Sequence, residues 1–277
     1  MTRLDVDHED FVLQWQQWHA AHEHALADPH GFLAVTSLRW LDEAPARFPD
    51  APGAWSTGED GVTVRLDDGE ELVVDGAVVR GVHRFGVVAE RASLFAGAGD
   101  AVIEIAKRGG ADILRPRHPD NRLRLDYTHT PAFAPDRRWA RVGRYLPFAT
   151  PREVTVGAAV EGLEHVYAAP GQVEFELEDG GPSYRLTAFE GARPGSLLVL
   201  FTDATSGVTT YAANRSLAVP APDAEGRVLV DFNRAINLPC AYTDLATCPL
   251  PPAGNRLPVA VEAGERIPYE REPAGIR

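Results

Sequence analysis

The sequence is short of several residue types, and each shortage excludes a class of protein. Lysine occurs once, at Lys107, and 27 basic residues stand against 40 acidic ones, which gives a formal charge of −13. Because a net field of this sign repels polyanions, nucleic acids and anionic membrane surfaces are excluded as general partners. Every apolar run falls short of the roughly 18 residues that a membrane-spanning helix needs, so we expect no membrane segment.

Cysteine is scarce too, with Cys240 and Cys248 in a single loop. The first residues lack the apolar stretch of a secretory signal, so we expect a cytoplasmic protein. In that compartment free or functional thiols are favoured, although the shared loop leaves a disulfide open. The alternatives for Cys240 are a buried thiol or loop staple, a nucleophile, and a zinc ligand.

The motifs that accompany common cofactors are missing. There is no Gly-x-Gly-x-x-Gly after a strand, no phosphate loop, no Gly-x-Ser-x-Gly and no His-Glu-x-x-His. We therefore expect no cofactor. If the protein is an enzyme, a cofactor-independent hydrolase is the least demanding possibility.

Three histidines lie close together near the N-terminus: His19, His22 and His24. The first two have the i,i+3 spacing that places side chains on one face of a helix. A zinc site needs further ligands, and no cysteine or second histidine pair is near in the sequence. We expect a solvated helix face and no metal site.

Hydrophobic periodicity predicts a mainly β fold with one long helix. Apolar residues recur at helical spacing over residues 8–27, where Trp15 and Trp18 are expected to pack on a sheet. From Trp55 the period changes to two, and turn residues separate the apolar runs. We expect the helix to be followed by two antiparallel units, each a β-sandwich or barrel-like, with a last strand at 257–263.

The chain is expected to divide into four consecutive segments. They are an N-terminal helical segment (1–50), a small antiparallel β unit (51–115), an arginine-rich connector (116–144) and a second β unit (145–277) that carries a long loop over 233–256.

Residues 115–144 contain eight arginines and three aspartates, a local formal charge of +5. One interpretation is an anion site, because guanidinium offers a fixed fork of donors to phosphate or carboxylate. The other is that the arginines join the two halves of the protein through acidic partners. Residues 115–122 are expected to form a site loop, because prolines argue against a central strand. The candidate ligand-binding residues here are Arg115, Arg117, His118 and Arg124.

Residues 201–211 form a second candidate region, with a hairpin loop between two apolar runs. Asp203 can satisfy the amides of that turn, which is a structural interpretation. Alternatively, Asp203 is catalytic, with Tyr211 and Arg215 binding the ligand, if these side chains face a pocket beside Asp231.

The longest irregular stretch runs from Asp231 to Arg256, and a loop of this length in a compact domain is usually functional. Asp231 ends an apolar strand, so its carboxylate could project into a pocket and act as acid or base. The alternative is that it caps the next turn or pairs with Arg215 or Arg234. The candidate ligand-binding residues of the stretch are Asn233, Asn237, Cys240, Asn255 and Arg256.

Several of these segments together resemble a known family. The matching segments are Phe201–Gly207, Asp231–Ala235, Asn237–Thr243, Cys248–Leu257 and Glu262–Glu265. They resemble an uncharacterised bacterial family, domain of unknown function 1684, and the likeness is densest over 200–265. The family implies no reaction, cofactor or active site. It supports the position of a site without naming its chemistry.

Two functions from different classes follow. In the first, a pocket in the second β unit, roofed by the long loop, binds a small polar and anionic molecule and, in the enzymatic case, hydrolyses it. In the second, the protein is a non-catalytic β-rich interaction module that docks a protein partner. The pocket is the favoured hypothesis. The sequence sets neither the ligand nor the oligomeric state.

Overall fold

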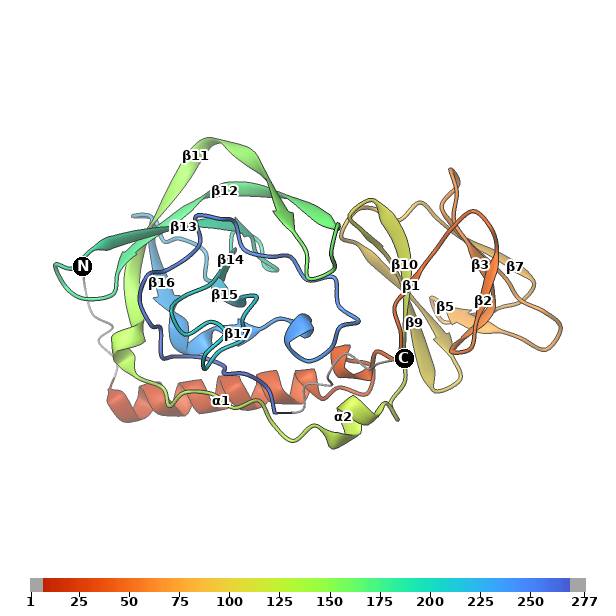
Figure 1. Cartoon of the computed structure of the whole chain (residues 1–277), viewed down its shortest axis with the longest axis horizontal. Coiled ribbons are helices and arrows are strands. Elements are labelled where there is room, and N and C mark those ends of the chain that lie inside the picture. The colour runs from red at the N-terminus through yellow and green to blue at the C-terminus, as the bar shows by residue number, and fades with distance from the viewer. Residues whose placement is uncertain (1–6, 270–277) are drawn as a thin grey trace. The chain divides into compact units, whose positions relative to one another are not determined.

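The computed structural model describes residues 7–269, which fold into two compact units (Figure 1). Of the described residues, unit 1 takes in 7–23, Thr128–Asp244 and 248–269. Unit 2 takes in His24–Tyr127 and Leu245–Thr247. Unit 2 is therefore an insertion between the N-terminal helix and the rest of unit 1. The division into four consecutive segments stays a prediction.

Helix α1 spans His8–Leu26, which confirms the helix predicted over 8–27. A carboxylate oxygen of Asp7 accepts a hydrogen bond from the Glu9 N–H at 3.1 Å, so Asp7 satisfies one of the unpaired amides of the first turn. Among the described residues, no helix is long and apolar enough to cross a membrane.

Unit 1 is built on one antiparallel sheet of seven strands in the order β16-β11-β12-β13-β14-β15-β17. The strands are β11 (Ala140–Gly157), β12 (Glu164–Glu176), β13 (Ser183–Glu190), β14 (Leu197–Phe201), β15 (Arg215–Val219), β16 (Arg227–Asp231) and β17 (Ile236–Asn237). The register of β11 against β12 shifts between Pro147 and Arg152, and both strands curve so that the sheet forms a half-barrel (Figure 1).

The inner face of this sheet buries the main core of unit 1. Every second residue of β12 is buried, as the period of two predicts. The ring of Phe232 lies 5.4 Å from that of Phe175 and 5.3 Å from that of Phe201, both close to edge-on. Leu257, Val261 and Ala263 join the same core from the last part of the chain.

Short helical turns connect the strands of unit 1. They are η2 (Arg137–Trp139), η3 (Phe232–Arg234) and η4 (Pro239–Ala241). The long loop therefore contains η4 and opens with η3 and β17. The strand expected at 257–263 is absent from the structure. That prediction was wrong because the segment makes isolated backbone hydrogen bonds to the turn after β14, from Leu257 to Thr202 and from Ala204 to Val259, and does not extend them into a ladder. Its apolar residues are buried against the core instead.

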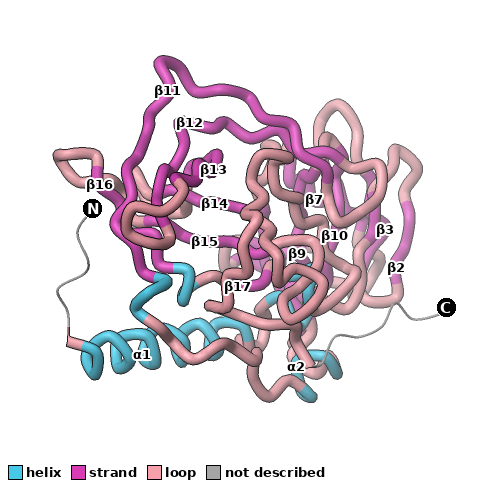
Figure 2. The backbone as a smooth tube through the Cα atoms, turned by 60° about the vertical axis from the view of Figure 1, so that its left-hand side comes forward, coloured by secondary structure: helices cyan, strands magenta, loops and turns pink. Residues whose placement is uncertain are grey.

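Unit 2 holds a six-stranded antiparallel sheet, β1-β10-β9-β8-β5-β6, and a four-stranded one, β2-β3-β4-β7. The strands are β1 (Arg39–Trp40), β2 (Ala46–Phe48), β3 (Ala51–Ser56), β4 (Val62–Arg65), β5 (Leu72–Val74), β6 (Ala77–Val79), β7 (Val82–Gly86), β8 (Ser93–Ala98), β9 (Ala101–Arg108) and β10 (Ala111–Arg117). Two short helices accompany them, η1 (Phe32–Ala34) and α2 (Arg122–Asp126). Figure 2 shows how strands dominate the described chain.

The two sheets of unit 2 share one core, as in a sandwich. Trp55 of β3 and Val64 of β4 pack in the same buried cluster as Leu72 of β5 and Ile103 of β9. The mainly β fold with one N-terminal helix and antiparallel sheets is thus confirmed.

The loop expected at 115–122 begins later than predicted, because β10 runs to Arg117 and includes Pro116. Pro116 is paired with Ile103 of β9, and its carbonyl accepts the Thr36 N–H at 2.9 Å. Strand β1 pairs with β10 only as far as Leu114. Pro116 therefore lies past the end of β1, where the N–H that proline lacks has no ladder partner to lose.

Candidate functional site

Glu265 carries a carboxylate that lies almost wholly inside unit 1, with 1% of the residue exposed. Its Oε2 accepts a hydrogen bond from the backbone N–H of Asn237 at 2.6 Å, and its own N–H donates to the Ala235 carbonyl at 2.9 Å. Gly264 precedes it with φ of +74°, and a Cβ there would lie 2.5 Å from the Ala235 carbonyl oxygen. This turn therefore requires glycine and fixes the backbone from which Glu265 projects.

Arg215 and Asp203, two of the predicted site residues, form a buried ion pair that supports this turn. Nη2 of Arg215 donates to Oδ2 of Asp203 at 2.6 Å. The same guanidinium also donates to the carbonyls of Val261 (3.1 Å), Ala263 and Glu265 (3.3 Å). Burial lowers the pKa of Arg215, and the charges of Asp203 and Glu265 offset part of that effect. The pair holds the segment that leads to Glu265.

Both oxygens of Asp203 accept hydrogen bonds within the protein. Oδ1 accepts from the N–H of Thr205 at 2.6 Å and from its hydroxyl, while Oδ2 accepts from Arg215. Tyr211 is also buried, with 9% of the residue exposed. The structure thus gives Asp203 the turn-satisfying contacts of the structural interpretation, and its catalytic role stays a prediction.

Helix α1 brings three further side chains toward Glu265. Nε2 of His22 lies 2.9 Å from Oε1 of Glu265, and Nε2 of His19 lies 3.6 Å from Oε1 of Glu23. Both oxygens of Glu23 accept from the backbone N–H of Thr130 at 3.2 Å. We refer to His19, His22, Glu23 and Glu265 as the His–Glu cluster.

The His–Glu cluster has a buried base and a partly exposed rim. The side chain of Glu265 is 1% exposed, whereas those of His19 and Glu23 are 17% exposed and that of His22 is 21% exposed. Burial lowers the pKa of His22, but the contact with Glu265 and the charges of Glu265 and Glu23 outweigh it and raise the pKa above its ordinary value. His22 is therefore a solvent-reachable imidazole backed by a buried carboxylate.

Two tryptophans stack on the imidazoles of the cluster. The Trp15 ring lies 4.7 Å from that of His19 with 15° between the planes, and the Trp18 ring lies 5.8 Å from that of His22 with 4° between the planes. These contacts restrict the orientation of both imidazoles. The tryptophans were expected to pack on the sheet only, so this role was missed.

Asp231 and Asn233 hold α1 in position. The indole N–H of Trp15 donates to the Asn233 carbonyl at 2.7 Å. Oδ1 of Asp231 accepts from the N–H of Asn233 at 3.1 Å and from its side-chain amide at 2.8 Å, which caps η3. Oδ2 of Asp231 lies 3.4 Å from Nε of Arg234. Burial raises the pKa of Asp231, and the hydrogen bonds of Asn233 and the charge of Arg234 counter it.

The long loop is fastened to the sheet by Asn255. Its side-chain amide bonds to the N–H and the carbonyl of Thr187 and to the carbonyl of Leu200, each at 2.8 Å. The N–H of Cys240 donates to Sγ of Cys248 at 3.3 Å, and both cysteines are buried and outside any disulfide. Arg256 is exposed. The side-chain amide of Asn237 donates to the Arg266 carbonyl at 2.8 Å.

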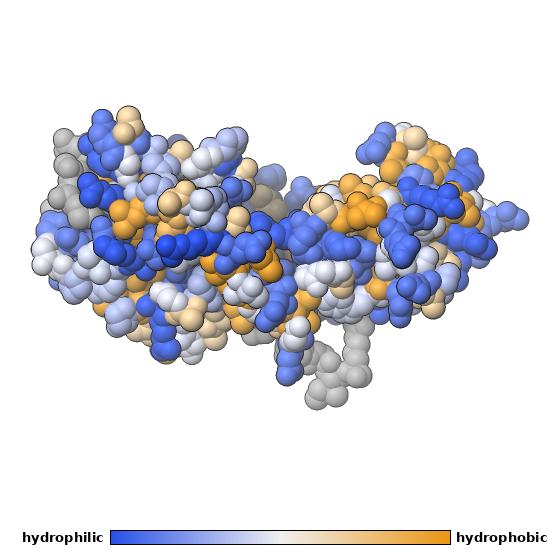
Figure 3. All heavy atoms as spheres, turned by 90° about the horizontal axis from the view of Figure 1, so that it is seen from above, coloured by the Kyte–Doolittle hydropathy of each residue, from blue (hydrophilic) through white to orange (hydrophobic). Residues whose placement is uncertain are grey.

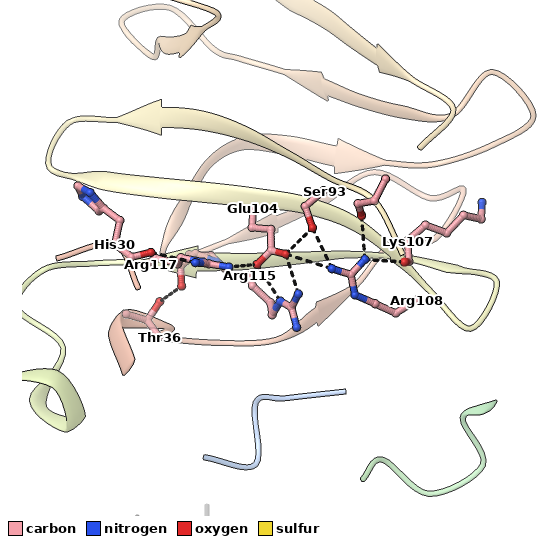
Figure 4. Close-up of polar contacts among 10 residues, drawn as sticks. His30, Thr36, Ser93, Glu104, Lys107, Arg108, Arg115 and Arg117 are labelled. Atoms are coloured by element: carbon pink, nitrogen blue, oxygen red, sulfur yellow. Dashed lines mark hydrogen bonds and ion pairs between the residues drawn. The ribbon is translucent and has the colours of Figure 1, made fainter. Parts of the chain in front are cut away.

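Arg115 and Arg117 belong to unit 2, where they surround Glu104 (Figure 4). Arg115 donates to both oxygens of Glu104, at 3.0 and 2.6 Å, and Arg117 donates to one of them. Ser93 and Arg108 complete the ring at 2.7 and 3.4 Å. Burial alone would raise the pKa of Glu104, but the two guanidinium groups of Arg115 and Arg117 more than offset it and lower the pKa to about 2.

His118 and Arg124 also lie in unit 2, and their side chains form hydrogen bonds with backbone groups. Nδ1 of His118 accepts from the Asp120 N–H at 3.1 Å, and Arg124 donates to the carbonyls of Ala27 and Pro119 at 3.1 and 2.8 Å. Arg115, Arg117 and Arg124 thus make their contacts within unit 2, and the first two are paired with Glu104.

Two cavities of unit 1 that are lined by described residues lie away from the His–Glu cluster. One of about 610 Å³ is bordered by Tyr145 and Leu197, and one of about 420 Å³ by Trp139 and Tyr184. A smaller one of about 120 Å³ is lined by Pro131, Arg266 and others, which neighbour Thr130 and Glu265 in the chain. The cluster is the candidate site because a partly exposed imidazole there meets a buried carboxylate.

Two short sequence signals could have indicated the cluster. The first is His19-Ala-Ala-His22-Glu23, in which His19 and Glu23 have i,i+4 spacing. The second is Glu262-Ala-Gly-Glu265, which the family resemblance contained. Three of its members, His19, Glu23 and Glu265, have ligand atoms that all lie within 4.8 Å of one another, so this group could hold a metal ion.

The model of a family described as protein of unknown function DUF1684 matches residues 125–266 of the chain. The chain belongs to the DUF1684 family. The matched segment contains Asp203, Arg215, Asp231 and Glu265, whereas the helical members of the cluster precede it. Sequence reasoning had named the same family, and that prediction is confirmed.

Among the solved structures similar to the DUF1684 chain is the solution NMR structure of an uncharacterized protein of Haloarcula marismortui. It is 32% identical, with 52% of this chain and 78% of that chain covered and a TM-score of 0.43. A comparison with curated proteins gave no match.

Proposed function

We propose that unit 1 is a hydrolase of small polar molecules whose reaction is carried by His22 and Glu265. The observation that carries the proposal is the 2.9 Å contact between Nε2 of the partly exposed imidazole and Oε1 of the buried carboxylate. In hydrolases a general base is commonly oriented by a carboxylate behind it. Here His22 takes the first role and Glu265 the second.

The roles follow from the exposure of the two side chains. Glu265 cannot meet a substrate directly because its side chain is 1% exposed, whereas that of His22 is 21% exposed. With Nε2 turned to Glu265, Nδ1 is the ring nitrogen left for water or substrate. The imidazole removes a proton from water as the resulting hydroxide attacks the substrate, and the imidazolium returns the proton to the leaving group. The net result is addition of water across one bond.

The environment supports such proton transfer. Burial tends to lower the pKa of His22, but the contact with Glu265 and the charges of Glu265 and Glu23 raise it, so the imidazolium that forms during proton transfer is stabilised. Stacking on Trp18 and the supports around Glu265 keep both groups in place. Two groups held in place in this way stabilise the transition state better than a mobile pair would.

The site would bind a polar substrate whose reacting group is neutral or positively charged. The sequence favoured an anion because of the arginine-rich segment, but Arg115 and Arg117 are paired with Glu104. The His–Glu cluster itself contains two carboxylates, which repel a negative charge.

The proposal is tested by hydrolysis of p-nitrophenyl acetate, a neutral ester probe. We expect His22→Ala to lower turnover by about 100-fold or more, the range of general acid–base catalysis. Bis(p-nitrophenyl) phosphate, which is anionic at its reacting group, is expected to be turned over more slowly than the neutral ester. The matched control is His24→Ala, on the same helix but exposed. Equal rates for the wild type and His22→Ala, or no turnover of p-nitrophenyl acetate, would contradict the proposal.

The alternative, a non-catalytic interaction module, is favoured by the surface of unit 2. Figure 3 shows apolar residues at the surface on the side where unit 2 is drawn. Six apolar side chains of unit 2 are 40–70% exposed, namely Val73, Val78, Val82, Val87, Leu94 and Phe95. Val73 and Val78 are paired across β5 and β6, so these two are neighbours. A contiguous exposed apolar surface commonly marks a docking site. Under this alternative, Val87→Asp abolishes association seen by sedimentation and leaves probe hydrolysis unchanged.

A further inference from the structure

Three side chains of the types that metals prefer converge within the His–Glu cluster. The ligand atoms of His19, Glu23 and Glu265 all lie within 4.8 Å of one another. Nε2 of His19 and Oε1 of Glu23 are 3.6 Å apart. Two ligands of a tetrahedral zinc ion, each about 2.0–2.2 Å from it, are about 3.3–3.6 Å apart. The His19–Glu23 distance therefore matches that of two ligands of a bound ion, and Glu265 is near enough to be drawn in as the third.

Two of these ligand atoms are buried. Nε2 of His19 has no aligned hydrogen bond, and Oε1 of Glu265, in a residue that is 1% exposed, has Nε2 of His22 at 2.9 Å as its neighbour. Buried polar atoms nearly always have a partner, so the histidine nitrogen calls for an explanation. A cation would give Nε2 of His19 a partner and would share Oε1 of Glu265 with His22.

The supporting contacts are those that orient metal ligands. The backbone N–H of Asn237 donates to the other oxygen of Glu265 at 2.6 Å, which leaves Oε1 turned to the cluster. The backbone N–H of Thr130 donates to both oxygens of Glu23 at 3.2 Å. His19 and Glu23 occupy i and i+4 of α1, so the helix presents both on one face. Outer hydrogen bonds of this kind fix the geometry of metal sites.

The charge and type of the ligands select the ion. Two carboxylates and a neutral imidazole leave a charge of about −2, which a divalent cation balances. An imidazole nitrogen suits zinc and neighbouring transition metals, whereas calcium and magnesium prefer all-oxygen sites. We propose that unit 1 binds one divalent transition-metal ion of the zinc class through His19, Glu23 and Glu265.

His22 has a different place in this arrangement. Its Nε2 faces the Glu265 oxygen at 2.9 Å, so it stands beside the carboxylate that the ion would share. With three protein ligands, the ion keeps a position open for water, as catalytic zinc sites do. The metal site stands independently of the proposed hydrolysis, because the ion can bind whether or not a substrate is turned over.

The experiment is a titration of the chelator-treated full chain with Co²⁺ and Zn²⁺. Visible absorption of bound Co²⁺ and calorimetry for Zn²⁺ report binding with no substrate present. We expect one ion per chain, with affinity lowered about 100-fold or more by His19→Ala and by Glu265→Gln. We expect His22→Ala to lower it by about 10-fold, the smaller effect of an outer residue. Mg²⁺ and Ca²⁺ are expected not to compete.

Two controls make the result decisive. His24→Ala removes an exposed histidine of the same helix and should leave the titration unchanged, which excludes binding to scattered surface histidines. Circular dichroism of the metal-free variants verifies that His19→Ala and Glu265→Gln remain folded. Wild-type affinity in a folded His19→Ala variant, or no bound ion in the wild type, overturns the metal site. If a variant loses probe hydrolysis but binds the ion as the wild type does, the result bears on the proposed reaction and leaves the metal site standing.

Discussion

Nη2 of Arg215 lies 2.6 Å from Oδ2 of Asp203, and the two side chains are 1% and 0% exposed. Removing one member of such a pair leaves the other buried and uncompensated, which costs about 3–5 kcal/mol. We therefore expect Arg215→Ala to lower the free energy of unfolding of unit 1 by about that amount in urea titrations. The matched control is Arg185→Ala, because Arg185 is 61% exposed in its pair with Glu174 and should contribute less than about 1 kcal/mol. Equal losses for the two variants would contradict the burial argument.

Gly264→Ala should destabilise unit 1 by about 2 kcal/mol or more. The residue has φ of +74°, and the new Cβ would lie 2.5 Å from the carbonyl oxygen of Ala235 and 2.8 Å from that of Phe232. Gly254→Ala is the control, because its Cβ would meet nothing within 4 Å and its φ is not left-handed. We expect that variant to change the melting temperature little. If Gly264→Ala has the same melting temperature as the wild type, the turn before Glu265 adjusts to a side chain more easily than its contacts indicate.

Unit 2 should lose stability in acid through Glu104. The folded pKa of about 2 lies below the ordinary value of 4.5, so the contribution is fully present above about pH 4.5 and is lost as the pH falls toward 2. A shift of this size corresponds to about 3 kcal/mol. Hydrogen exchange of β9 and β10 amides, followed from pH 5 to pH 2, measures it. In Glu104→Gln the same amides should be less protected at pH 5 and should lose less protection on acidification.

Trp15→Phe should loosen α1 without unfolding unit 1. The change keeps an aromatic ring but removes the indole N–H that donates to the Asn233 carbonyl at 2.7 Å, a loss of about 1 kcal/mol. Hydrogen exchange of peptides within α1 would show faster exchange. Trp40→Phe is the control, because Trp40 is 43% exposed and should leave α1 exchange as in the wild type.

Local patterns predicted the elements whose signal lies within a few residues. The periods of 3.6 in α1 and two in β12 are properties of short stretches, so both were visible in the sequence. The exceptions depend on distant partners. Pro116 fits into β10 because β1 stops short of it, and Val261 is buried without a strand because the core of unit 1 receives it.

Three of the residues predicted for a site lie near Glu265. Arg215 bonds to the Glu265 carbonyl and to Asp203, and the N–H of Asn237 bonds to the Glu265 carboxylate. Neither His22 nor Glu265 was among the predicted site residues, whose roles stay a prediction. His22 and Glu265 themselves come from opposite ends of the chain. No spacing rule joins residues so far apart, because only the packing of α1 against unit 1 brings them together.

The insertion of unit 2 within unit 1 has a consequence for biosynthesis. As the nascent chain leaves the ribosome, α1 emerges first but has no sheet to dock on. The sandwich of unit 2 can form next, since all ten of its described strands follow directly within His24–Tyr127. Unit 1 closes last, when Asn255 has reached β13 and β14 and Glu265 has reached His22. A truncated product that stops before residue 255 would therefore lack the tie between Thr187 and Leu200 and would leave the core without Leu257, Val261 and Ala263, a state that quality-control proteases would degrade.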